Sequence, residues 1–120
     1  MRIYVSHSTD MNYNDEIYLP LKEVLSDSSC ELILPHESSA EIINTRNDYR
    51  DIDIVIAECS RPSTGVGIEL GWFYDDGKPI YCFCREGLKI SDSVKVVVSD
   101  IFYYKDKKDF IEKVKTIIKS

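Results

Sequence analysis

The chain has 120 residues, of which 43% are hydrophobic, and its 21 acidic and 15 basic side chains give a net charge of −6. This length suits a single domain, residues 1–120, and the hydrophobic content excludes a disordered chain. The acidic balance argues against a nucleic-acid polymer as partner, although backbone N–H groups can still hold one phosphate of a small ligand.

No apolar run approaches the roughly 18 residues that span a bilayer, so we expect no membrane partner. The first residues also lack the apolar stretch of a signal peptide, because only three apolar residues separate Arg2 from Ser6. We therefore expect a cytoplasmic protein.

Predicted strands and helices alternate along the chain. The first strand covers 2–6, and apolar residues at helical spacing follow over 14–27, where Pro20 predicts a kink or a late start. A short strand is predicted at 31–34, whereas the mostly polar segment 37–49 has only a weak helical face.

The second half of the chain has a more regular pattern. Residues 52–57 are nearly all apolar and β-branched, which is typical of a strand buried on both faces. A glycine-rich loop leads to a helix over 66–74, and further strands are predicted at 79–84 and 94–98. The last helix covers 106–119, with its first residue, an aspartate, as N-cap.

This alternation predicts a parallel sheet with helices on both faces, and five strands favour the flavodoxin-like (Rossmann-like) α/β order 2-1-3-4-5. Ligands of such sheets bind at the carboxyl ends of the strands where the winding reverses, here between the first and third strands. That point brings Ser6, His7 and Ser8 alongside the loop 58–67. The order of the elements alone therefore predicts where a ligand binds.

The segment 58–69 carries the strongest local signal for function. Gly65 and Gly67 permit backbone conformations closed to other residues and let a ligand approach the main chain. Glu69 is predicted in the first turn of the helix, where the helix dipole favours a carboxylate. An ionised carboxylate beside a ligand can attack an anomeric carbon; the alternative is a glutamate that only stabilises its helix.

Several other polar residues have two interpretations each. Ser63 either caps the helix that follows it or donates its hydroxyl to a phosphate or sugar oxygen. His7 and His36 each follow a predicted strand, so they either converge on a ligand or are ordinary polar residues at strand ends. Asp48 lies in an acidic stretch before the third strand, and the aromatic residues 72–74 are expected to pack rather than to stack on a base.

The four cysteines, Cys30, Cys59, Cys82 and Cys84, form no CxxC pair. Cys82 and Cys84 would share one face of a strand, which leaves a zinc or redox pair as an alternative. We prefer buried reduced thiols, and we expect neither a metal nor a cofactor.

Two segments resemble the nucleoside 2-deoxyribosyltransferase superfamily, and within it the 2′-deoxynucleoside 5′-phosphate N-hydrolase branch. They are residues 53–58, with the sequence DIVIAE, and residues 62–71, with the sequence PSTGVGIELG. The similarity extends forward to Arg85 and back to Tyr4. It implies a flavodoxin-like fold, a homodimer with composite active sites, and a small-molecule nucleotide or nucleoside as substrate.

The resemblance also implies roles for single residues. Glu69 matches the glutamate nucleophile that forms a glycosyl-enzyme intermediate, and Tyr4 matches a tyrosine that positions it. Ser63 matches a serine on the 5′-phosphate, Ser8 belongs to a loop that borders the phosphate, and Ser91 falls near a serine donated across the dimer. The predicted catalytic set is Glu69, Tyr4 and Asp48, and the predicted substrate-binding set is Ser8, His7, His36, Ser63, Gly65, Gly67 and Ser91.

Three positions depart from the family pattern. His7 stands where the family has glycine, and Asp10 stands where it has a basic residue. Thr45 stands where the family has an aspartate that helps the base to leave, and Asp48 is the nearest substitute.

Three hypotheses for function follow. The leading one is an N-glycosidase that hydrolyses (deoxy)nucleoside 5′-monophosphates through Glu69, with Asp48 assisting the departing base. The second is a deoxyribosyltransferase, in which a second base replaces water. The third is a nucleotide-binding module without catalysis, which the three departures favour.

Overall fold

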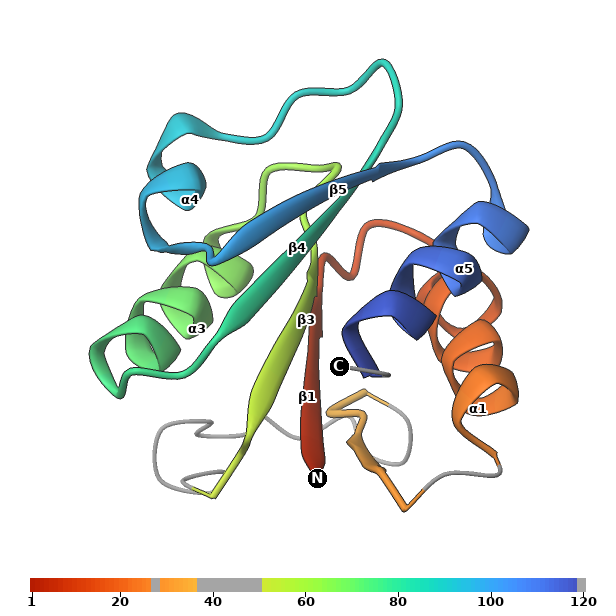
Figure 1. The fold of residues 1–120 in the computed structure, drawn as a ribbon. Helices are drawn as coiled ribbons and strands as arrows, with labels where there is room; N and C mark the ends of the chain where they lie inside the picture. The colour runs from red at the N-terminus through yellow and green to blue at the C-terminus, as the bar shows by residue number, and fades with distance from the viewer. Residues whose placement is uncertain (27–28, 37–50, 119–120) are drawn as a thin grey trace.

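The computed structural model describes residues 1–26, 29–36 and 51–118, which include five parallel strands in one sheet (Figure 1). The strands, listed by their bounds, are β1 (Arg2–His7), β2 (Glu31–Ile33), β3 (Ile54–Glu58), β4 (Ile80–Arg85) and β5 (Asp100–Tyr104). Their order is β2-β1-β3-β4-β5, which confirms the predicted flavodoxin-like topology. All four pairings are parallel, so the carboxyl ends of the strands lie along one edge of the sheet, here called the carboxyl edge.

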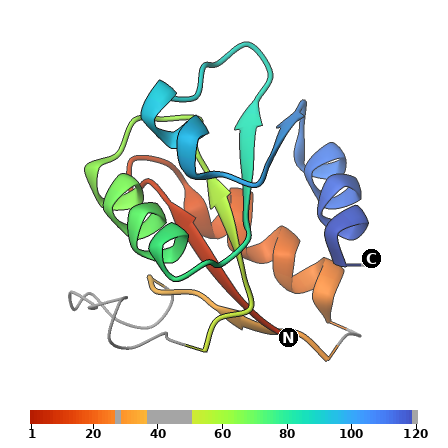
Figure 2. The same ribbon diagram turned by 60° about the vertical axis from the view of Figure 1, so that its left-hand side comes forward.

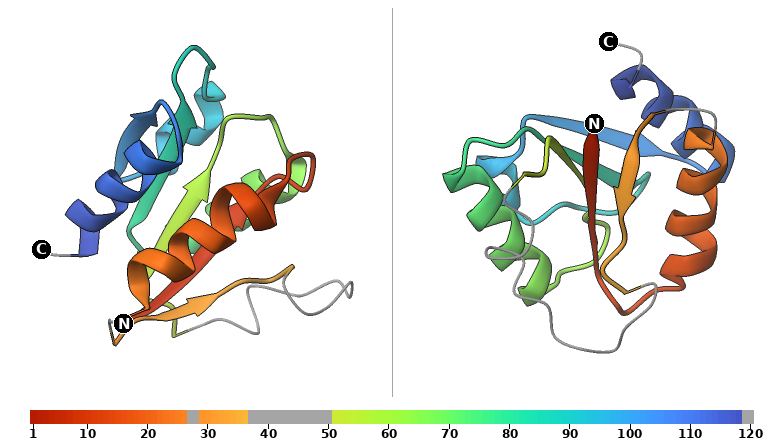
Figure 3. Two further views of the ribbon diagram at one scale, coloured as in Figure 1. Left: turned by 90° about the vertical axis from the view of Figure 1, so that its right-hand side faces the viewer. Right: turned by 90° about the horizontal axis from the view of Figure 1, so that it is seen from below.

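Helices cover both faces of the sheet, as the alternating pattern predicts. One face carries α3 (Thr64–Asp75) and α4 (Asp92–Val97), and the other carries η1 (Asn14–Tyr18), α1 (Leu19–Leu25) and α5 (Lys107–Ile118). Figure 3 shows the two layers of helices with the sheet between them. None of the helices in the described ranges is long and apolar enough to cross a membrane.

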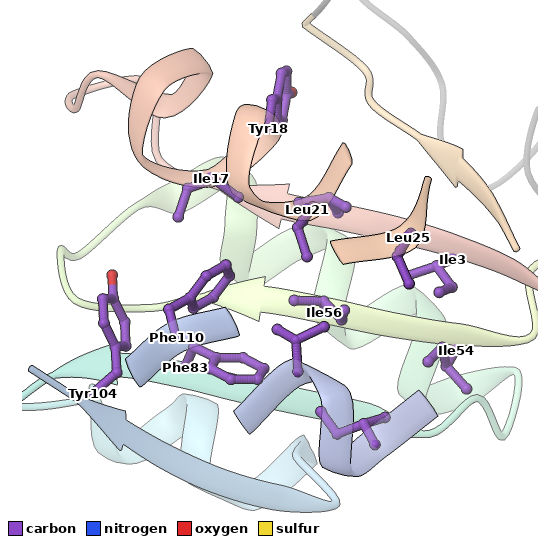
Figure 4. Packing of buried hydrophobic residues seen from close by; sticks show 13 residues of the cluster. Ile3, Ile17, Tyr18, Leu21, Leu25, Ile54, Ile56, Phe83, Tyr104 and Phe110 are labelled. Carbon is purple, nitrogen blue, oxygen red and sulfur yellow. The ribbon is translucent and has the colours of Figure 1, made fainter. Parts of the chain in front are cut away.

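Strand alternation divides the core into two clusters, one for each face. On β1, Ile3 and Val5 point to the α1/α5 face, whereas Tyr4 points to the α3 face. Figure 4 shows the α1/α5 cluster, where Ile3 lies beside Leu25 and Ile56 lies near Leu21. In the same cluster the ring of Phe110 from α5 meets the ring of Phe83 at a centroid distance of 5.0 Å.

Local chemistry explains where the helices begin. The α-helical part of the first predicted helix starts at Leu19, directly after the π-helical turn η1, so Pro20 lies where the helix changes from π to α geometry. Asp106 caps α5 as predicted, since its Oδ1 accepts a hydrogen bond from Asp109 N at 2.9 Å. Asp109 Oδ2 in turn accepts one from Lys105 N at 2.9 Å.

One predicted strand is wrong. Residues 94–98 were expected to form the fifth strand because they are rich in valine, but residues 92–97 form α4 and the fifth strand is Asp100–Tyr104. Val94 and Val97, three residues apart, pack against the α3-side cluster, whereas Val96 between them is 74% exposed. Burial at helical spacing thus overrides the β propensity of the valine run.

We predict that Phe110→Ala lowers the free energy of unfolding by about 3–5 kcal/mol, because it empties a buried site between two aromatic rings. Chemical denaturation followed by circular dichroism measures this change. Val96→Ala, on an exposed position, is the control and should change the free energy by less than about 0.5 kcal/mol. Equal losses in the two variants would contradict the placement of the core.

Candidate active site

The helix α3 brings Glu69 to the carboxyl edge, but not in its first turn as predicted. The helix begins at Thr64, because Ser63 is its N-cap, and no acidic residue lies in its first turn. Glu69 therefore lies in the second turn, where the dipole of the helix start is weaker than we expected. Val66, Leu70 and Phe73 are buried against the sheet, and Glu69 lies on the same side, four residues before Phe73.

Two hydroxyl groups of β1 hold the Glu69 carboxylate. The Tyr4 hydroxyl donates to Oε2, and the Ser6 hydroxyl donates to Oε1 at 2.9 Å. Tyr4 and Ser6 are two residues apart on the strand, so both side chains point to the α3 face. The Tyr4 ring also packs on Phe73 at a centroid distance of 5.0 Å. Each carboxylate oxygen thus has its own donor, and the group is fixed in orientation.

The start of α3 leaves its surface open beside this carboxylate. Ser63 Oγ accepts a hydrogen bond from Val66 N at 3.3 Å, which shows that Ser63 caps the helix. Gly65 and Gly67 have helical rather than positive φ values, so the expectation of unusual backbone conformations is wrong. Apart from the chain neighbours and the backbone of the helix itself, a Cβ at Gly67 would meet no described atom within 4 Å, and a Cβ at Gly65 would meet only Ser63 Oγ at 3.9 Å.

The loop after β1 reaches the same edge as the start of α3 (Figure 2). His7 is only 5% exposed, and both of its ring nitrogens contact the protein: Nδ1 lies 2.9 Å from Ser8 O and Nε2 lies 2.6 Å from Tyr18 Oη. Ser8 is also buried, and its Oγ accepts from Asp10 N at 3.0 Å. Direct contact of His7 with a substrate stays a prediction.

A second carboxylate, Glu58, lies at the end of β3 on the opposite face and is 2% exposed. Its Oε1 accepts from Ser60 N at 2.7 Å, and its Oε2 accepts from the hydroxyls of Ser60, at 2.8 Å, and Tyr104. Burial, followed by the charge of Glu58, raises the pKa of Tyr104, which keeps its hydroxyl protonated as a donor. Ser60 Oγ accepts from Arg85 N at 2.8 Å. These bonds fix the loop that leads to Ser63.

Arg85 extends this network to a helix. Its guanidinium forms a salt bridge with Glu16 of η1 and lies over the Tyr104 ring, 5.6 Å from the ring centroid. Sequence reasoning did not single out Glu58 or Tyr104. The available signal was a charged residue at the end of the apolar run of β3, where a buried carboxylate requires hydrogen-bond donors.

The remaining predicted residues are less closely joined to Glu69. His36 is exposed after β2, and its ring lies 5.3 Å from the His7 ring. Ser91 is exposed at the start of α4, and its donation across a dimer stays a prediction. Asp48, together with the ambiguous segment 37–49, lies outside the described residues.

The cysteines agree with the interpretation we preferred. All four are free thiols, and three of them, Cys59, Cys82 and Cys84, are buried. Within the described ranges, no three His, Cys, Asp or Glu side chains gather in a way that could hold a metal ion.

No family model matches the chain. The 5-hydroxymethyl-dUMP N-hydrolase of Mus musculus is 53% identical to this chain over 36 residues, which are 30% of this chain and 21% of that protein. The match thus spans about a fifth of the curated relative's length.

Two solved structures share the fold over nearly the whole chain. The CMP N-glycosidase BcmB of Clostridium botulinum has a TM-score of 0.68 at 22% identity, covering 96% of this chain and 99% of its own. A 2-deoxyribosyltransferase of Bacillus psychrosaccharolyticus has a TM-score of 0.66 at 19% identity, covering 92% of this chain and 90% of its own. With the short sequence match, they confirm the resemblance to the nucleoside 2-deoxyribosyltransferase superfamily.

We predict that the stability of the protein falls as the pH drops below about 6.5, the ordinary pKa of histidine. Burial, followed by the proximity of His36, lowers the pKa of His7 in the folded protein. The unfolded chain therefore takes up a proton at His7 first, which favours unfolding at acid pH. Besides His36, the groups near His7 are Tyr13, Tyr18 and, on the neighbouring strand, Glu58.

Denaturation curves over a series of pH values measure this effect. His7→Gln should lose less free energy of unfolding on acidification than the wild type does. His36→Gln removes the other histidine and should keep most of the wild-type dependence of the free energy of unfolding on pH, because burial, the larger cause of the lowered pKa of His7, remains. If the free energy of unfolding depended on pH in the same way in His7→Gln and in the wild type, His7 would not be the group responsible.

Proposed function

We propose that this protein is an enzyme that cleaves the N-glycosidic bond of nucleoside 5′-monophosphates, with Glu69 as the nucleophile. The observation that carries the proposal is the Glu69 carboxylate, held by Tyr4 and Ser6 at the edge of the sheet where ligands of this topology bind. The curated relative and one structural neighbour, by their names, act on nucleoside monophosphates.

The chemistry takes place in two displacement steps. In the first, a Glu69 oxygen forms a bond to C1′ of the sugar while the bond from C1′ to the base nitrogen breaks and its electron pair leaves with the base. In the second, water attacks C1′ from the vacated face and the Glu69 carboxylate departs, so the sugar phosphate is released with net retention. The base takes up one proton and the water gives up one, so the overall reaction is a hydrolysis.

The Tyr4 and Ser6 hydroxyls orient the nucleophile for this attack. Because they donate to different oxygens of Glu69, the carboxylate cannot rotate, and its remaining lone pairs face a defined direction. Tyr4 is buried among apolar side chains, which keep water away from one side of its hydrogen bond with Glu69. The expected advantage is a carboxylate that needs little reorganisation before attack.

The phosphate of the substrate would lie beside Ser63 and Ser8. Gly65 and Gly67 have no side chains, and the open space above them supports close approach of a ligand to the helix start. Ser91 from a second copy of the chain would complete this site in a homodimer. Asp48 is the proposed group that assists the departing base.

A deoxyribosyltransferase is the second candidate, which the fold shared with the Bacillus enzyme favours. The glycosyl-enzyme step is common to both functions, and only the acceptor differs. Incubation of a deoxynucleoside, and separately its monophosphate, with and without a second free base distinguishes them. Exchange of bases on the unphosphorylated nucleoside would overturn the hydrolase assignment.

We predict that Glu69→Gln lowers base release from nucleoside monophosphates by on the order of 1,000-fold or more, because an amide oxygen is a poor nucleophile at C1′. Chromatographic detection of the free base measures the rate, and calorimetry measures binding of the substrate. Retained binding with lost turnover is the expected pair of results. A wild-type protein that binds nucleotides without releasing base would instead support the non-catalytic module.

We predict that Tyr4→Phe lowers kcat by roughly 10- to 100-fold, since one Glu69 oxygen then loses its donor. The ring and its packing on Phe73 remain, so the melting temperature should change little. Tyr81→Phe makes the same chemical change on β4, where the ring packs on the other face of the sheet, and serves as the matched control. Unchanged kcat in Tyr4→Phe would argue against Glu69 as the reacting group.

A further inference from the structure

Four rings gather on the α1 side of the carboxyl edge, next to the proposed phosphate site. His7 stacks on Tyr13 at a centroid distance of 4.5 Å, and its edge meets Tyr18 at 5.1 Å and His36 at 5.3 Å. Tyr18 is fully buried and lies at the end of the π-helical turn η1. Such turns are rare and occur frequently at functional sites.

Three hydrogen bonds run through this cluster in one direction. The backbone N–H of His36 donates to Tyr18 Oη at 3.2 Å, and Tyr18 Oη lies 2.6 Å from His7 Nε2. His7 Nδ1 lies 2.9 Å from the carbonyl oxygen of Ser8. Because a backbone N–H only donates and a carbonyl only accepts, the donor and acceptor at the two ends of the chain are fixed.

These fixed ends determine the form of the imidazole. Nδ1 must carry a proton to donate to Ser8 O, so a neutral His7 has an unprotonated Nε2 that accepts from the Tyr18 hydroxyl. A charged His7 would donate from both nitrogens and leave the Tyr18 proton without a partner in a buried position. Burial lowers the pKa of His7, which supports the neutral form.

The chain of bonds joins three segments that are separate in sequence. His36 belongs to the turn after β2, Tyr18 to η1, and Ser8 to the loop after β1. Ser8, His7 and His36 are all predicted to bind substrate, but both ring nitrogens of His7 are engaged by Ser8 and Tyr18, and Tyr18 is fully buried. Burial, followed by Tyr13 and then by the charge of Glu69, raises the pKa of Tyr18, so Glu69 is the smallest of these contributors.

We propose that Tyr18 and His7 form a positioning pair that sets Ser8 and His36 for substrate binding without touching the substrate. The inference rests on the proposed function, because it assigns the pair to the phosphate side of that same site. It adds Tyr18 to the residues on which the site depends. It also gives His7, which stands where the resembled family has glycine, a role inside the protein rather than at the ligand.

The test begins with a readout that needs no activity. The chain has only two histidines, so ¹⁵N-detected NMR of the imidazole nitrogens resolves both. In the wild type, His7 should be neutral with the proton on Nδ1. In Tyr18→Phe, the Nε2 signal should shift because its donor is gone. A wild-type His7 with the proton on Nε2 would overturn the proposed direction of the bonds.

The second measurement is steady-state base release from a nucleoside monophosphate. Tyr18→Phe removes two hydrogen bonds from the segments that hold the substrate, so KM should rise roughly tenfold. The value of kcat should stay within about twofold, because Glu69 keeps Tyr4 and Ser6. An unchanged KM, or a loss confined to kcat, would overturn the positioning role.

Ile17→Val is the matched control for loss of stability. Ile17 is the fully buried neighbour of Tyr18 on η1, and its truncation weakens the same packing without altering a hydrogen bond of the pair. It should lower the melting temperature and leave KM unchanged. A KM in Ile17→Val that rises as much as in Tyr18→Phe would mean that general loosening of η1 causes the effect, which overturns the proposal.

The two proposals fail in different ways. A wild-type protein that releases no base from any nucleoside monophosphate refutes the proposed function. In that case binding of the monophosphate, measured by calorimetry on the wild type and on Tyr18→Phe, replaces KM. Equal affinities of the two proteins would then refute the positioning pair independently of catalysis.

Discussion

The site depends on one constraint: a carboxylate held between a helix and a sheet must find donors on both of its oxygens. Glu69 meets it through Tyr4 and Ser6, which lie two residues apart on β1 and so point to the same face. Phe73, one helical turn after Glu69, packs on the Tyr4 ring and fixes the rotation of α3. Apolar packing and polar pairing therefore specify the same orientation of the helix, and the carboxylate is directed at β1.

The opposite face of the sheet meets the same requirement with different residues. Glu58 is more deeply buried than Glu69 and takes its donors from Ser60 and Tyr104. These hydrogen bonds all join Glu58 to other residues of the protein, and they hold the loop that leads to Ser63 in place. We thus propose Glu69 as the reacting carboxylate and Glu58 as a structural one, and the difference in burial distinguishes the two roles. A half-buried group beside an open helix start can meet a ligand, whereas a sealed one cannot.

Much of the fold could be predicted from the sequence, because the order of a parallel sheet follows from alternating elements and a winding rule. The fifth strand could not, since the valine run 94–98 has strand propensity while its burial pattern, visible only after packing, is helical. Within the proposed site, the sequence motif marks Glu69 and Ser63, whose roles stay predictions. The contributions of Ser6, Glu58 and Tyr18 depend on partners 11 to 63 residues away, and no local pattern records such pairings.

The alternation of β1 has a consequence for how this site tolerates change. Tyr4 and Ser6 serve the α3 face, while His7, the next residue, serves the α1 face. The pairing of β1 with β3, which matches Ser6 to Ala57 and His7 to Glu58, keeps each set on its own side. A slip of one residue would exchange the two sets and place an imidazole where the carboxylate needs hydroxyls. The hydrogen-bond ladder between two central strands is therefore as much a determinant of the chemistry as any side chain at the edge.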